Sequence, residues 1–158
     1  MPQPFYLDKL RNLSMNRVGG KKSPHKVCML LAVIDLIQAG NITSNRIEFN
    51  QALKDRFTVY FDRFAQGNDK NTPENPFFHL RSEDFWFHSY NEGYEASTIK
   101  KYSAKAISHA YLDEQLYRDM KSFIVSNELK EALASNLTDL ATLFHQWLVD
   151  IGKSDKTA

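Results

Sequence analysis

The segment that most constrains the fold is VCMLLAVIDLI at residues 27–37, which is apolar almost all round. Its only polar side chain is that of Asp35. A helix without a polar face must be buried on every side, so the sequence predicts a central, buried helix here. Ser23 and Pro24 are typical of the N-cap and the first helical position, and Gly40 is expected to end the helix.

Other apolar spacings predict more helices and a few short strands. Residues 45–49 alternate polar and apolar side chains, which is typical of a strand, and Asn50 follows as a candidate N-cap. The aromatic-rich runs 77–81 and 84–88 flank Ser82-Glu83 and predict a β-hairpin. Apolar residues three or four apart predict further helices at residues 5–15, 50–65, 103–111, 113–126 and 128–151.

These elements predict an α+β, mainly α, fold. We expect a winged-helix-like core of helices, a short strand and an aromatic β-hairpin, with a C-terminal helical annex. A length of 158 residues fits one domain. We expect this domain to span residues 1–151, followed by a linker or tail at 152–158.

The composition excludes several protein classes. Cys28 is the only cysteine, which excludes an internal disulfide and a Cys-rich zinc module. No apolar run approaches the ~20 residues of a membrane span, and the first residues lack a basic-then-apolar signal. We therefore expect a cytoplasmic protein in a reducing compartment.

The net charge of +1 conceals an uneven distribution of charged residues. Residues 9–34 carry six Lys or Arg and no acid, whereas residues 113–150 are mainly acidic. Such segregation favours a polyanionic partner for the basic part of the chain. The alternative is a solvated basic face with no partner.

Motifs of catalysis and cofactor binding are absent. The chain has no Gly-rich phosphate loop and no CxxC, HExxH or GxSxG motif. One metal constellation is conceivable, His79 and His88 with Glu83 and Asp84 between them, but no third strong ligand is spaced to complete it. Hydrogen-bonded wall residues are the alternative for the two histidines. We expect no metal, no cofactor and no enzymatic activity of this chain alone.

The start of the apolar helix, KKSPHK, is the most informative polar segment. It combines three lysines with a serine and a histidine: Lys21, Lys22, Ser23, His25 and Lys26. Free backbone N–H groups, the helix dipole and the cations all favour an anion there, and a phosphodiester is the natural candidate. The alternative is that Ser23 only caps the helix and the lysines face water.

Three segments together resemble a known family. They are SPHK at the helix start, the continuation DLIQAGNITSNRI, and NPFFHLRSEDFW about fifty residues further on. Over roughly residues 20–90, the sequence resembles the DNA sulfur-binding domain of McrA-like HNH restriction endonucleases, which recognise phosphorothioate-modified DNA. In that family, the sulfur that replaces a non-bridging phosphate oxygen lies in a small apolar surface cavity.

The resemblance implies a sulfur pocket formed by His25, Lys26, Asn75, Pro76 and His79. Asn75 stands where the family often has Tyr, and His79 stands where a small residue can occur. Pro76 would form one wall of an apolar notch, and a rigid turn in an aromatic hairpin is its alternative role. A phosphate oxygen in such a notch would lose hydrogen bonds to water at a cost of about 1–3 kcal/mol, whereas sulfur would lose little.

Further residues are predicted to contact the DNA outside the sulfur pocket. Arg81 is our candidate for contacting guanine O6 and N7, and a carboxylate partner, Glu83 or Asp84, is its alternative. The residues predicted to attract the phosphate backbone lie at the helix start and in a second basic cluster: Lys21, Lys22, Ser23, Lys100 and Lys101.

We therefore expect a module that binds phosphorothioated double-stranded DNA without a cofactor and without a membrane, as the recognition part of a type IV, modification-dependent restriction system. The resemblance implies that cleavage belongs to a separate HNH module outside this chain. The main alternative is a winged-helix DNA-binding or transcriptional module without sulfur selectivity. A metal-dependent enzyme built around His79 and His88 is a third hypothesis.

Overall fold

Helices and two small antiparallel sheets form the part of the chain that the computed structural model describes, which is residues 4–15, 17–18 and 21–137. The elements are α1 (Pro4–Arg11), β1 (Arg17–Val18), β2 (Lys21–Lys22), α2 (His25–Gln38), β3 (Arg46–Ile47), α3 (Gln51–Phe64), α4 (Glu74–His79), the 3₁₀ turn η1 (Leu80–Ser82), β4 (Trp86–Tyr90), the 3₁₀ turn η2 (Ala96–Thr98), β5 (Ile107–Leu112), α5 (Glu114–Lys121) and α6 (Phe123–Ala134). No helix among these residues is long and apolar enough to cross a membrane.

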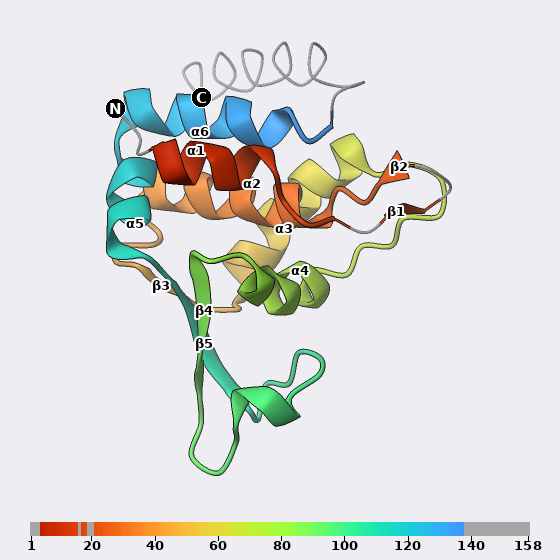
Figure 1. The fold of residues 1–158 in the computed structure, drawn as a ribbon, viewed down its shortest axis with the longest axis vertical. Coiled ribbons are helices and arrows are strands. Elements are labelled where there is room, and N and C mark those ends of the chain that lie inside the picture. Colours follow the sequence, from red (N-terminus) through yellow and green to blue (C-terminus); the bar gives the residue numbers. More distant parts are fainter. Residues whose placement is uncertain (1–3, 16, 19–20, 138–158) are drawn as a thin grey trace.

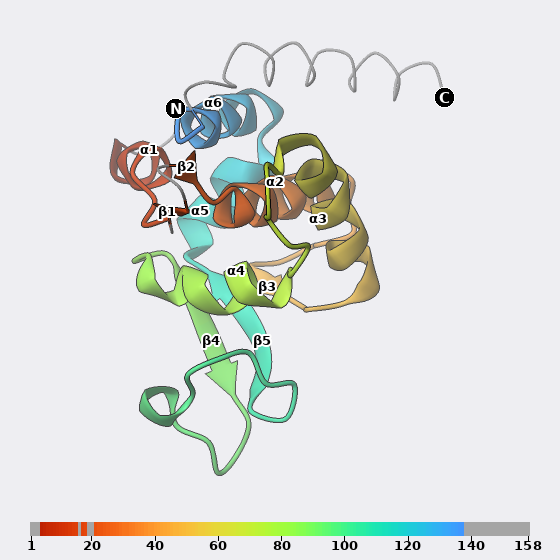
Figure 2. The same cartoon turned by 90° about the vertical axis from the view of Figure 1, so that its right-hand side faces the viewer.

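The helix α2 lies at the centre, and the other helices pack around it. Every side chain from Val27 to Ile34 is fully inaccessible to solvent. The helix α3 packs on one side of α2, while α1 and α6 lie next to each other on another side (Figures 1 and 2). The prediction of a central, buried helix is therefore confirmed.

The elements α2, β3, α3, α4, β4 and β5 follow one another in the order of a winged-helix core. The three strands form one antiparallel sheet in the order β3-β5-β4. The β4–β5 pair projects away from the helices (Figure 1), and we call its connection, residues 91–106, the wing. The helices α5 and α6 pack on α2 as a helical annex. The predicted α+β, mainly α, fold class is confirmed.

The expected ends of α2 are confirmed in part. Gly40, at φ +82°, follows the last turn, and its N–H donates to the Ile37 carbonyl at 3.2 Å, as expected for a glycine that ends a helix. At the other end, Pro24 occupies the N-cap position and no side chain caps the helix. Ser23 as the N-cap residue is therefore wrong. The predicted N-cap Asn50 is confirmed, because its side chain accepts from the Leu53 N–H at 3.0 Å.

The predicted hairpin of residues 77–81 and 84–88 is wrong, because the first of these runs is helical. Residues 74–79 form α4 and residues 80–82 form η1, and Phe77, Phe78 and Leu80 all turn toward the core from this helical segment. Pro76 is the third residue of α4, where the missing N–H would have no partner within the helix. The second run forms β4, which pairs with β5 instead.

The helix predicted at residues 103–111 is also wrong, because this segment contains the central strand β5. Ala110 lies opposite Ile47 of β3 and opposite His88 of β4. A strand with neighbours on both sides gains hydrogen bonds from distant parts of the chain. Apolar spacing within one short segment does not report such pairing.

The remaining helix boundaries differ by smaller amounts. The first helix ends at Arg11 and does not reach residue 15. The helix predicted at 113–126 divides at Ser122, whose hydroxyl caps α6 by accepting from the Val125 N–H at 3.3 Å. The helix α6 ends at Ala134. Residues 138–151 of the last predicted helix and the linker predicted at 152–158 lie outside the described residues.

Asp35, the polar residue within the apolar run of α2 at residues 27–37, joins three helices. Its Oδ2 accepts from Arg56 Nε and from the Tyr60 hydroxyl of α3, each at 2.6 Å, and its Oδ1 lies 3.2 Å from Lys130 Nζ of α6. The carboxylate side chain is only 11% exposed. Burial and the neighbouring Asp35 carboxylate raise the pKa of Tyr60, so its hydroxyl keeps the proton that it donates.

We predict that Asp35→Ala lowers the free energy of unfolding by about 3 kcal/mol, because it leaves the half-buried cations of α3 and α6 without their shared acceptor. The control is Glu48→Ala, which removes an exposed ion pair with Arg46 and is expected to cost less than about 1 kcal/mol. Urea unfolding of both variants measures the two losses. Equal losses would show that Asp35 does not join the helices.

Candidate nucleic-acid interface

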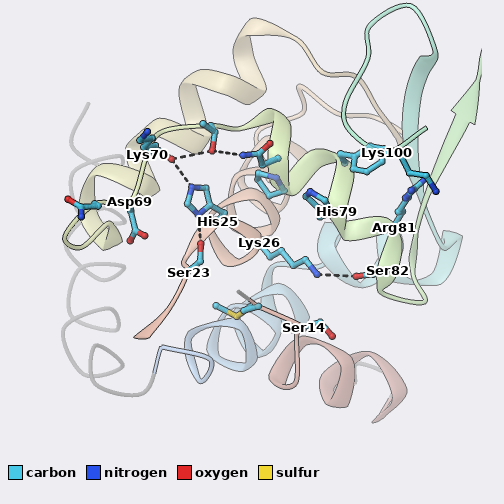
Figure 3. Close-up of a pocket in the computed structure, with 16 residues that line it drawn as sticks. Ser14, Ser23, His25, Lys26, Asp69, Lys70, His79, Arg81, Ser82 and Lys100 are labelled. Atoms are coloured by element: carbon cyan, nitrogen blue, oxygen red, sulfur yellow. Dashed lines mark hydrogen bonds between the residues drawn. The ribbon is translucent and has the colours of Figure 1, made fainter. Parts of the chain in front are cut away.

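An open hollow of about 810 Å³ lies beside the start of α2, bounded by α4, by the loop of residues 66–73 and by the wing (Figure 3). Three of the predicted site residues do not line the hollow. Lys101 is exposed elsewhere on the surface, and Lys21 and Lys22 form β2, shortly before α2 begins. Most of the site residues predicted from the sequence line the hollow: Ser23, His25, Lys26, Asn75, Pro76, His79, Arg81 and Lys100.

His25 connects the first turn of α2 to the loop of residues 66–73. Its Nε2 lies 2.7 Å from the Lys70 carbonyl oxygen, and its Nδ1 lies 2.5 Å from the Ser23 hydroxyl (Figure 3). Because a carbonyl only accepts, Nε2 carries the proton, and Nδ1 of the neutral ring accepts from Ser23. The ring also packs on Phe61, with 5.1 Å between centroids. Both ring nitrogens therefore have partners within the chain.

The hydrogen-bonded chain continues from His25 across the loop to α4. The Lys70 carbonyl also accepts from the Thr72 hydroxyl at 3.3 Å, and this hydroxyl accepts from Asn75 Nδ2 at 3.1 Å. Figure 3 shows these contacts along one side of the hollow. Asn75 therefore uses its amide to hold the loop against the first turn of α4.

Lys26 is part of a buried ion pair. Its Nζ lies 2.9 Å from Glu83 Oε2 and 3.1 Å from Ser82 Oγ. The side chains of Lys26 and Glu83 are only 10% and 5% exposed, and Glu83 Oε2 also accepts from the Ser14 N–H at 3.3 Å. Because Glu83 balances its charge, Lys26 contributes mainly its methylene stem to the hollow.

The apolar part of the wall comes from α4. Pro76 and Phe78 both line the hollow, and both are buried apart from this face. Together with the stem of Lys26, they offer carbon atoms to a ligand. Carbon surface solvates a charged oxygen poorly, and it accommodates a larger and softer atom at little cost.

Positively charged residues outnumber carboxylates around the hollow. Lys70, Arg81 and Lys100 line it in addition to the paired Lys26, and Asp69 is the only acid among the described residues that line it. The lysines at 70 and 100 are exposed. The first-turn N–H groups of α2 add partial positive charge at the same place. This surface favours a polyanion such as a nucleic-acid backbone.

His79 ends α4 and lies at the hollow (Figure 3). Partial burial lowers its pKa, and the positive charges of Lys26 and Arg81 lower that pKa further. The free protein therefore keeps this ring neutral at neutral pH. An anion bound next to the ring would favour its protonated form.

Arg81 is bound to the wing. Its Nη1 donates to the Tyr90 hydroxyl at 3.1 Å, and further N–H groups donate to wing carbonyls. The carboxylates that were its alternative partners bind lysines instead: Glu83 binds Lys26, and Asp84 binds Lys9 at 2.7 Å. That alternative is wrong, whereas a contact of Arg81 with a base stays a prediction.

The four residues considered for a metal ion do not converge. The His88 ring is buried with its Nε2 2.9 Å from the Phe77 carbonyl, which makes it a hydrogen-bonded wall residue. Burial, partly offset by this hydrogen bond, lowers its pKa. Glu83 and Asp84 are paired with lysines. Among the described residues, no group of three or more His, Cys, Asp and Glu could hold a metal ion.

Sequence reasoning missed the parts of the site that depend on distant contacts. Lys70 and Thr72 lie between the predicted elements, where the sequence analysis named no site residue, and Phe78 belongs to a segment predicted as a strand. No local pattern in the sequence marks Lys70 as a site residue. Its loop lies at the start of α2 because the Lys70 carbonyl is hydrogen-bonded to the distant ring of His25. The spacing of Phe77, Phe78 and Leu80 after two prolines was a usable signal for the helix α4.

Comparisons with known proteins give a family and a fold. A solved sulfur binding domain of ScoMcrA, complexed with phosphorothioated DNA, is similar with a TM-score of 0.55 and 19% identity over 93% of this chain and 90% of that chain. A larger solved chain with the sulfur binding domain and SRA domain of ScoMcrA, also complexed with phosphorothioated DNA, has a TM-score of 0.55 and 18% identity over 87% of this chain. The present chain covers only 41% of that larger one.

At these identities, the two solved structures support the fold alone. A search of curated proteins gave no match. The sequence model described as ScoMcrA-like, DNA sulfur-binding domain matches residues 5–147, which is most of the chain. On this match, and in agreement with the resemblance found in its motifs, the chain belongs to the family of ScoMcrA-like DNA sulfur-binding domains.

Proposed function

We propose that this chain binds double-stranded DNA that carries a phosphorothioate linkage, and that the hollow beside α2 holds the sulfur. The observation that carries the proposal is that His25, Lys26, Asn75, Pro76 and His79 all line this one hollow. Membership of the sulfur-binding family supports it, as do two similar structures that are complexes with phosphorothioated DNA.

Selectivity for sulfur arises from the carbon surface of the hollow. A phosphorothioate keeps its negative charge, but its sulfur is larger and a weaker hydrogen-bond acceptor than oxygen. Against Pro76, Phe78 and the stem of Lys26, a phosphate oxygen would lose water without replacement, at a cost of about 1–3 kcal/mol. This cost corresponds to roughly 5- to 150-fold discrimination, obtained by rejecting the oxygen.

Attraction to the DNA backbone comes from the cations at the rim. Lys70 and Lys100 are exposed at the hollow and can reach phosphates on either side of the bound linkage. Lys21, Lys22 and Lys101 extend this basic surface in our proposal. These contacts do not depend on sulfur, and they weaken as salt rises.

In our proposal the chain is a recognition domain over residues 1–151 and has no catalytic role. It serves a modification-dependent restriction system in which a separate HNH module cleaves the DNA. A winged-helix module that binds DNA without regard to sulfur is the second candidate, and the order of α2, β3, α3, α4, β4 and β5 favours it. The two candidates differ in one measurable quantity, the affinity ratio between modified and unmodified DNA.

The affinity ratio between modified and unmodified DNA tests the proposal directly. We expect the protein to bind a duplex with one phosphorothioate at least fivefold more tightly than the same duplex without sulfur, because the carbon wall rejects oxygen. Fluorescence anisotropy with the two separated phosphorothioate diastereomers and the unmodified duplex measures it. We expect only one diastereomer to show the preference, since only one directs its sulfur at the wall. Equal affinity for all three duplexes would support the second candidate.

Pro76→Ala is expected to reduce the preference for sulfur severalfold, because it removes ring carbons from the wall and adds an N–H group that can bind an oxygen. Affinity for unmodified DNA is expected to stay the same or rise. The matched control is Pro73→Ala, at the N-cap of the same helix but outside the lining of the hollow. An equal loss of preference in both variants would assign the effect to the helix and not to the wall.

We predict that Lys100→Ala weakens binding to modified and unmodified duplexes by the same factor. It should reduce the slope of log affinity against log salt concentration by about 0.9, the value for one lost phosphate contact. Lys121→Ala removes an equal charge from α5, away from the hollow, and should leave the slope unchanged. A slope that Lys100→Ala does not change would exclude this lysine from the interface.

Binding is expected to strengthen as the pH falls below 7, because the pKa of His79 is lowered in the free protein and an adjacent phosphate raises it in the complex. The gain should level off once the free protein is also protonated. His79→Gln is expected to remove this gain, whereas His109→Gln, a histidine outside the hollow, should keep it. The measurement is the affinity for one duplex between pH 5 and pH 8.

A further inference from the structure

The wing reaches the sulfur-binding hollow through a single lining residue, Lys100. We propose that Arg81 is a positioning residue that holds the turn at Ala96–Ile99 against α4, and so places Lys100 at the rim of the hollow. The effect of Arg81 on DNA binding rests on the function proposed above. Its effect on the turn does not.

The contacts of Arg81 span the base of the wing. The guanidinium donates from Nη1 to the Ala96 carbonyl at 3.0 Å and from Nη2 to the Ile99 carbonyl at 2.8 Å. These two carbonyls lie at the start and just after the end of η2. Lys100 follows Ile99 directly, so its backbone position is set by this pair of hydrogen bonds.

Arg81 is itself held in place by buried groups. Its guanidinium carbon lies 4.2 Å from the centroid of the Phe78 ring, and its Nη1 also donates to the Tyr90 hydroxyl at 3.1 Å. This hydroxyl is 3.4 Å from Nδ1 of the buried His88, and Nε2 of the same ring is 2.9 Å from the Phe77 carbonyl. The contacts connect the wing to the body of α4 through Arg81.

The turn has little else to hold it. All three residues of η2 are exposed, and the turn closes only through short-range hydrogen bonds, such as Ile99 N–H to the Ala96 carbonyl at 3.3 Å. Ile99 packs partly on the core and is the nearest apolar anchor. An exposed 3₁₀ turn of this length is weak without a tertiary contact, so the guanidinium supplies the main restraint.

The chemistry requires arginine at this position. A planar guanidinium can donate from two nitrogens to two carbonyls while one face stacks on an aromatic ring. Lysine offers one compact ammonium on a flexible stem and cannot bridge both carbonyls in this geometry. Arg81→Lys therefore keeps the positive charge and removes the bridge.

The test is a double-mutant cycle of Arg81→Lys and Lys100→Ala, measured by anisotropy on one phosphorothioated duplex over a range of salt concentrations. Each single variant is expected to weaken binding by up to about fivefold and to lower the salt slope by about 0.9. The double variant is expected to match the singles, since both changes remove the same phosphate contact. Arg118→Lys on α5, where the exposed arginine lies 3.8 Å from Glu114, is the control and should bind as the wild type does.

Amide hydrogen exchange of the free protein provides a readout that needs no DNA. Arg81→Lys is expected to speed exchange at Thr98 and Ile99 at least tenfold while the amides of α2 keep their protection. Tyr90→Phe removes one acceptor of Arg81 and should act in the same direction but more weakly. If Arg81→Lys fails to fold, hydrogen exchange of the Tyr90→Phe variant tests the proposal instead.

The outcomes separate the proposals. Additive losses in the cycle, or unchanged exchange at the turn, would overturn the positioning role. Additive losses with an altered base preference would indicate direct base contact by Arg81. A wild-type protein that binds neither duplex would overturn the proposed function, and the exchange measurement would then still decide the role of Arg81 in the wing.

Discussion

The burial of α2 on every side is the constraint on which the rest of the structure depends. Because the helix has no solvent-facing side, the chain must cover it, and α3, α4, α5 and α6 all pack on it. The N-terminus of α2 is left open at the surface, next to α4 and the wing. The candidate site is therefore attached directly to the core, because the first turn of the buried helix α2 lines it.

The ion pair of Lys26 with Glu83 explains how the hollow combines an apolar wall with a positively charged rim. A free ammonium at the start of α2 would attract any phosphate oxygen as strongly as a sulfur. Paired with a buried carboxylate, Lys26 instead adds methylene groups to the wall of Pro76 and Phe78, while exposed lysines at the rim provide the attraction for the backbone. In the proposed function, DNA affinity and sulfur selectivity thus come from different atoms, which is why the substitutions proposed above separate them.

The sequence was informative wherever one segment determines its own environment. The apolar run of α2, the Asn50 cap, the Gly40 terminus and the cationic helix start could all be predicted, and the family motifs brought His25, Asn75 and Pro76 into one hypothesis. The errors concern long-range contacts. The strand β5 exists because two distant strands flank it, and the helix α4 with the turn after it buries Phe77, Phe78 and Leu80 in the core. The pairing of Lys26 with Glu83 and the loop over His25 likewise join residues far apart in the chain.

The base of the wing is held by specific side-chain contacts, whereas the end of the wing is exposed to solvent. Tyr102 packs on Phe49 at 4.7 Å between centroids, Asn91 donates to the Lys105 carbonyl at 2.8 Å, and Arg81 holds the turn between them. Beyond these ties, residues 92–95 are exposed; a side chain at Gly93, which has φ +89°, would strain the turn locally but would meet no neighbour within 4 Å. The end of the wing can therefore be lengthened, shortened or recharged without strain reaching the hollow. If the proposed function holds, the length and charge of the wing can change how far the protein extends along a duplex without altering the hollow that holds the sulfur.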